Sequence, residues 1–169
     1  SKGAGVTRNQ KPLSEWHVKD GEVRGLNFIV RLPTVGTGVK LVIYDTNFWK
    51  SFVDRRWRTP FGSPGNLGLY GSRPAEHQLF ADHCTAEKAT EEYGNGRTVE
   101  EWEHKSSRPD NDWLDCLVGC HVAVGVQGLV WSASDAIPDD KNRTVPSTPR
   151  KSLREQMEEQ RSKRPGFRP

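Results

Sequence analysis

Residues 110–127 form the segment that most constrains how this chain can fold. Asp110 or Asn111 can cap a helix there, and nearly every position from Trp113 to Val126 is apolar. A helix that is apolar on almost all sides is predicted to be buried. The rest of the chain must therefore supply elements that cover this segment.

Two apolar runs earlier in the chain predict strands. Residues 26–32 (LNFIVRL) stop at Pro33, and residues 39–44 (VKLVIY) are rich in β-branched side chains. A helix is expected over 48–58, with its cap among Asp45-Thr46-Asn47. Strands alternating with helices predict an α/β fold.

The middle of the chain gives weaker patterns. Its composition predicts a short strand over 67–70, a helix over 74–90, a turn at 93–96 and a half-exposed strand over 97–105. Residues 1–25 are polar and Gly-rich and show no clear period.

The composition divides the chain into a globular part, 1–132, and a Pro-rich linker with a basic tail, 133–169. Residues 141–169 hold nine Lys/Arg and three Asp/Glu, a balance of +6, so the other 140 residues have a balance of −3. A basic tail can bind DNA through counterion release. A solvated, disordered end explains the same composition equally well. A charged helix over 152–163 is also expected.

Three cysteines, Cys84, Cys116 and Cys120, do not form a paired disulfide framework, and no apolar run is long enough to span a membrane. These features favour a reducing, cytoplasmic setting. Cys116 and Cys120 lie four residues apart on the apolar helix, where we expect small buried thiols and not a zinc site.

Asp45 and Asp115 are the candidate catalytic and metal-binding carboxylates. Asp45 follows a predicted central strand, where ligands of α/β proteins gather, although an Asp in this place is also a typical helix cap. Asp115 lies one turn inside the apolar helix, where an unpaired charge is costly. Alternatively, Asp115 faces outward near the helix N-terminus. Together the two acids suit Mg²⁺ or Mn²⁺, although such sites normally use more ligands.

Other charged residues give less specific signals. Lys50 and Arg55 on the predicted helix, and Arg150 and Lys151 in the tail, are candidate DNA-binding residues. Alternatively, Lys50 and Arg55 are charged residues that keep an exposed helix soluble. His83 and Glu87, four residues apart, could join a metal site, but we interpret them as an ordinary helix surface pair.

Several short motifs occur in the order seen in lambda-like phage terminase large subunits, which this chain resembles over residues 2–130. They are Lys2-Gly3, residues 42–50 (VIYDTNFWK), 64–69 (PGNLGL) and 77–87 (HQLFADHCTAE), then Trp102 and residues 110–116 (DNDWLDC). In that family a strand ends in Asp and is soon followed by Lys. A Pro-Gly loop, an "ltaE"-like segment, a lone Trp and an "N-x-x-LDC" helix come next.

The resemblance implies an RNase H-like nuclease domain, with a mixed sheet flanked by helices, that cuts concatemeric double-stranded DNA during genome packaging in the host cytoplasm. It implies two bound divalent ions, with Asp45 matching the strand-end acid and Asp115 the late helix acid. The implied partners are a terminase small subunit and the portal or procapsid. The family's first catalytic Asp precedes the Lys-Gly motif, so we expect a partial domain that is inactive alone. A non-catalytic DNA- or capsid-binding module, or a degenerate prophage remnant, is the alternative.

Overall fold

A computed structural model describes residues 1–33, 38–106 and 110–128. The strands are β1 (Lys2–Ala4), β2 (Val23–Gly25), β3 (Phe28–Arg31), β4 (Leu41–Asp45), β5 (Glu87–Gly94) and β6 (Arg97–His104). The helices are α1 (Thr46–Arg58), α2 (Gln78–Cys84) and α3 (Asp112–Val126), with short 3-10 helices η1 (Leu13–Glu15) and η2 (Pro74–His77). The predicted linker and tail, 133–169, lie outside the described residues.

Four strands form a mixed sheet in the order β1-β4-β3-β2. β1 runs parallel to β4, whereas β3 is antiparallel to both β4 and β2. Gly3 lies opposite Tyr44, and a Cβ atom on Gly3 would stand 2.5 Å from the Thr46 Oγ1 atom. The close approach of β1 to the junction of β4 and α1 therefore requires glycine at this position. The predicted α/β class with a mixed sheet is confirmed.

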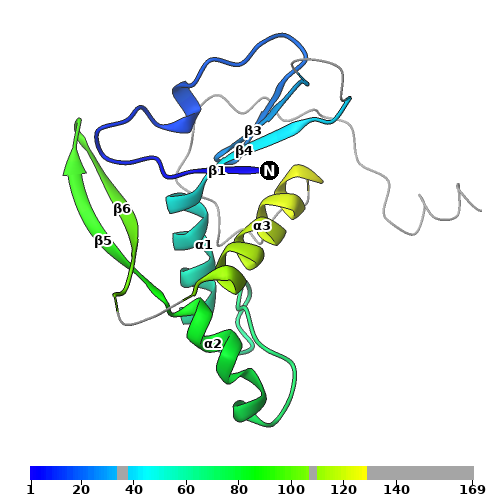
Figure 1. Ribbon diagram of the computed structural model, residues 1–169, viewed down its shortest axis with the longest axis vertical. Helices are drawn as coiled ribbons and strands as arrows, with labels where there is room; N and C mark the ends of the chain where they lie inside the picture. The colour runs from blue at the N-terminus through cyan, green and yellow to red at the C-terminus, as the bar shows by residue number, and fades with distance from the viewer. Residues whose placement is uncertain (34–37, 107–109, 129–169) are drawn as a thin grey trace, which may run out of the picture. The chain divides into compact units, whose positions relative to one another are not determined.

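The main core lies between this sheet and the helices α1 and α3, which pack against each other (Figure 1). Trp49 is fully buried there and makes edge-on contacts with Phe48 and Phe52. Its indole N–H donates to the carbonyl oxygen of Asn27 at 3.2 Å, so the ring is satisfied at its polar end as well. The buried members of the core are Phe28, Trp49, Phe52, Val53, Leu114, Val118 and Val122.

The helix α3 is buried along one side only, which corrects the prediction of a helix buried all round. Leu114, Val118 and Val122 face the core, whereas Cys116 and Cys120 are exposed. The prediction of buried thiols is therefore wrong for these two residues. Hydrophobicity alone overestimates burial here, because the neighbours of α3 in the described residues cover a single face. No described helix is long and apolar enough to cross a membrane.

The strands β5 and β6 form a separate antiparallel hairpin, paired from Glu87 with His104 to Gly94 with Arg97 (Figure 1). Asn95 and Gly96 have positive φ values of 50° and 75°, the conformation that tight hairpin turns require. The predicted turn and the strand over 97–105 are confirmed. The helix predicted over 74–90 ends at Cys84, and its last residues belong to β5. The cross-strand ladder overrides the weak local pattern there.

The other local predictions have mixed outcomes. The strands over 26–32 and 39–44 and the helix over 48–58 are confirmed as β3, β4 and α1. The strand predicted over 67–70 is wrong: the Leu67 amide bonds to the Arg56 carbonyl at 3.1 Å, which ties this loop to α1. The short strands β1 and β2 were not predicted, because three residues are too few to show a period.

Candidate functional site

Asp45 is the last residue of β4 and the N-cap of α1. Its Oδ1 atom accepts a hydrogen bond from the Phe48 backbone N–H at 3.3 Å, and only 7% of the residue is exposed. The cap that the sequence left open among three residues is therefore Asp45. The side chain satisfies one of the free N–H groups at the start of the helix.

Burial raises the pKa of Asp45 from its ordinary 3.8 to about 6. Hydrogen bonds to the carboxylate from backbone groups and a nearby positive charge oppose this shift without cancelling it; they come from Phe48, Val6, Asn47 and Arg97. The low-dielectric surroundings thus dominate, and they disfavour the charged form of the carboxyl group.

We expect Asp45→Asn to stabilise the fold at pH 7 by about 2–3 kcal/mol and to have little effect at pH 4. Between pH 4 and pH 6 the folded state retains the Asp45 proton that the unfolded state has lost, so wild-type stability falls as pH rises through this window. Asn keeps an acceptor for the Phe48 N–H and cannot ionise. Urea unfolding of both proteins from pH 4 to pH 7 measures the difference.

The matched control is Asp112→Asn, at an exposed acid of α3. Its stability difference from wild type should stay small across the same pH range. A difference for Asp45→Asn that does not grow with pH would show that burial of the Asp45 charge is not costly.

A second polar group joins α1, β5 and α3, and we call Lys50, Glu87, Asn111 and Asp115 the Lys50 cluster. The Lys50 Nζ atom lies 2.5 Å from Glu87 Oε1 and 3.1 Å from Asp115 Oδ1. The Asn111 side-chain amide donates to Glu87 Oε1 and, at 3.3 Å, to Asp115 Oδ2. Two carboxylates are thus bridged by one ammonium group and one amide.

The Lys50 cluster has a closed side and an open side. The side chains of Lys50 and Glu87 are 8% and 5% exposed, whereas that of Asp115 is 52% exposed. The outward-facing interpretation of Asp115 is therefore correct, and the argument from a charge buried in an apolar helix is wrong. Asp115 still differs from an ordinary surface acid, because it is paired with a buried lysine.

Glu87 is the member of the cluster whose surroundings the sequence did not predict. The favoured interpretation, a surface partner of His83 on a helix, is wrong, because Glu87 begins β5 and is buried. The resemblance to terminases did indicate that Glu87 could be important, since Glu87 is the final residue of the family-like segment 77–87.

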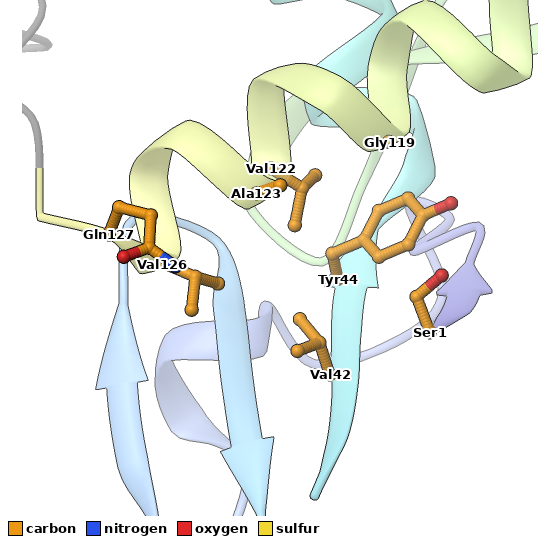
Figure 2. A pocket seen from close by; sticks show the side chains of 8 residues that line it. All are labelled: Ser1, Val42, Tyr44, Gly119, Val122, Ala123, Val126 and Gln127. Carbon is orange, nitrogen blue, oxygen red and sulfur yellow. The ribbon is translucent and has the colours of Figure 1, made fainter.

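The described contacts do not bring Asp45 and Asp115 together. Tyr44 and Val42 of β4 point toward α3 (Figure 2). Successive side chains of a strand point to opposite faces, so Asp45, which follows Tyr44, is expected to face away from α3. Burial raises the pKa of Tyr44, and the negative charge of Asp115 adds to that rise. On the side of β4 that faces α3 there is an open pocket of about 210 Å³, lined by Ser1, Val42, Tyr44, Gly119, Val122, Ala123, Val126 and Gln127.

The four predicted DNA-binding residues differ in their surroundings. The Lys50 ammonium is held by Glu87 and Asp115, so a DNA contact would have to replace an ion pair. Arg55 is 57% exposed, with its Nη1 atom 3.5 Å from Glu100 Oε2. Arg150 and Lys151 lie outside the described residues. Within the described ranges, no group of three or more His, Cys, Asp or Glu side chains could hold a metal ion.

Comparison with known families assigns this mixed α/β chain, with its acidic Lys50 cluster, to a class of nucleases. Residues 8–135 match the family of the terminase large subunit gpA, endonuclease domain. The match covers most of the chain, so the chain belongs to this family. No curated protein and no solved structure matches the chain.

Proposed function

We propose that this chain is part of the metal-dependent endonuclease of a phage terminase large subunit, which cuts concatemeric double-stranded DNA as the genome is packaged. The observation that carries the proposal is the family match over residues 8–135. The terminase small subunit and the portal or procapsid are the proposed partners, the host cytoplasm is the proposed location, and RNase H-like is the proposed fold family.

The Lys50 cluster supports a role for Asp115 in this nuclease. All four of its residues belong to motifs through which the chain resembles terminases: Lys50 and Glu87 each end one, and Asn111 and Asp115 share a third. These residues are far apart in sequence and converge on one group of hydrogen bonds. Asp115 is the member that reaches solvent, so we propose that it is the acid that faces DNA.

Mg²⁺ or Mn²⁺ dependence is proposed from the family, with Asp45 and Asp115 as the predicted ligands. The donor groups of the described residues do not fit two ions. Asp45 caps a helix away from Asp115, and Asp115 shares Lys50 with Glu87. The additional acidic ligands of a two-ion site would therefore have to come from outside the described residues.

Asp115→Asn in the full-length protein is expected to reduce Mn²⁺-dependent plasmid cleavage at least about tenfold, or about 1.4 kcal/mol in activation free energy. The amide keeps the shape of the side chain and removes its charge, so the circular dichroism spectrum should not change. Initial cleavage rates on supercoiled plasmid provide the measurement.

Asp112→Asn is the matched control, because Asp112 is also exposed in the first turn of α3. It should cut at nearly the wild-type rate. If Asp115→Asn also cuts normally, Asp115 is structural. A wild-type protein that binds DNA without cutting it would favour the non-catalytic module or the prophage remnant.

A further inference from the structure

The Lys50 ammonium stands where two carboxylates converge. It lies within hydrogen-bond distance of Glu87 Oε1 and Asp115 Oδ1, and the Asn111 amide bridges the same two side chains. A divalent ion shared by Glu87 and Asp115 would have to occupy the same space. It would also lie in contact with a positive charge, and like charges in such surroundings repel strongly.

Burial keeps the ammonium in this place. As whole residues, backbone included, Lys50 and Glu87 are each 7% exposed. Lys50 therefore cannot turn away without leaving the Glu87 charge buried and unpaired. The second carboxylate oxygen of Glu87, Oε2, is buried and has no hydrogen-bond partner among the described residues. A hydrated ion cannot reach this oxygen unless the cluster opens.

We propose that Lys50 is the built-in cation of the Glu87–Asp115 pair, so that this pair binds no Mg²⁺ or Mn²⁺ while Lys50 is in place. The inference rests on the proposed function only in naming the ions that the nuclease would use. Lys50 is then a positioning residue, which fixes the Asp115 carboxylate at the surface. Any ion used in cleavage would be held by other ligands, away from this pair.

Titration of the full-length chain with Mn²⁺ alone tests this inference, with line broadening of backbone amide NMR signals as the readout. In the wild type, the signals of Ala86, Glu87 and Lys88 should survive millimolar Mn²⁺. Lys50→Met removes the built-in cation and should create a site that broadens these signals at a Mn²⁺ concentration at least tenfold lower. Lys50→Arg keeps the charge and should behave as the wild type does.

Selective broadening at Glu87 in the wild type, at the concentration that affects Lys50→Met, would overturn the inference. If Lys50→Met does not fold, the wild-type titration still decides, because Mn²⁺ binding at Glu87 contradicts the inference and its absence supports it. The experiment involves no DNA cleavage. A protein that does not cleave plasmid can therefore still show no Mn²⁺ binding at Glu87, as we infer. Conversely, a protein that cleaves plasmid can still bind Mn²⁺ at Glu87 and contradict the inference.

Discussion

Lys50→Met is expected to lower the free energy of unfolding by about 3–5 kcal/mol, the usual cost of breaking a buried ion pair from one side. The substitution leaves the Glu87 carboxylate in a site where its side chain is 5% exposed, with only the Asn111 amide as a donor. Asp115 adds little to the cost, because its exposed side chain can be solvated by water. Urea denaturation followed by tryptophan fluorescence provides the measurement.

Lys88→Met is the matched control. Lys88 pairs with Glu103 at 2.9 Å on the hairpin, but both side chains are more than half exposed, so the expected cost is at most about 1 kcal/mol. The double variant Lys50→Met, Glu87→Leu should recover much of the loss, since it removes the buried Glu87 charge and leaves only the half-exposed Asp115 carboxylate, which water can solvate. Equal costs for Lys50→Met and Lys88→Met would mean that the Lys50 pair is not effectively buried.

Trp49→Ala is expected to cost about 3–5 kcal/mol, because it leaves a cavity at the centre of the main core. Trp49 has no exposed surface, and its ring centroid lies 5.1 Å from that of Phe52 and 5.5 Å from that of Phe48. The variant also leaves the Asn27 carbonyl without the indole donor. The change in thermal midpoint and in urea midpoint measures the loss.

Trp113→Ala removes the same side chain from a position that is 47% exposed. Its ring meets Phe80 edge-on at 5.5 Å, so we expect a loss of about 1 kcal/mol. Similar losses for the two variants would show that the α1–α3 core tolerates the cavity or collapses around it.

Much of the fold can be predicted from local patterns, where a pattern is long enough to be specific. The β-branched run at β4, the helix α1, the strand β6 and the helix α3 are all visible in the sequence. The short strands β1 and β2 are not visible, because they exist through pairing with β4 and β3. The strand β5 is assigned wrongly for the same reason, since its partner β6 determines its conformation.

The candidate site is less predictable than the fold. The sequence identified Asp115 for the wrong physical reason, since it is a half-exposed residue and not a buried charge. It favoured a surface position for Glu87 and interpreted Lys50 as either a DNA contact or a solvated helix residue, but it did not predict that the two are buried partners. Burial and ion pairing between residues 37 positions apart depend on how α1, β5 and α3 pack, and no local spacing encodes that packing.

The sequence by itself determined the α/β class and the resemblance to terminases, and it limited the α1 cap to three neighbouring residues, since each depends on residues close together in the chain. Only the tertiary structure decided that α3 keeps an open face, that Asp45 and Asp115 have separate partners, and that Lys50 joins Glu87 to Asp115. The physical reason is that the free energy of a charge depends on its surroundings, and these surroundings are assembled from distant parts of the chain.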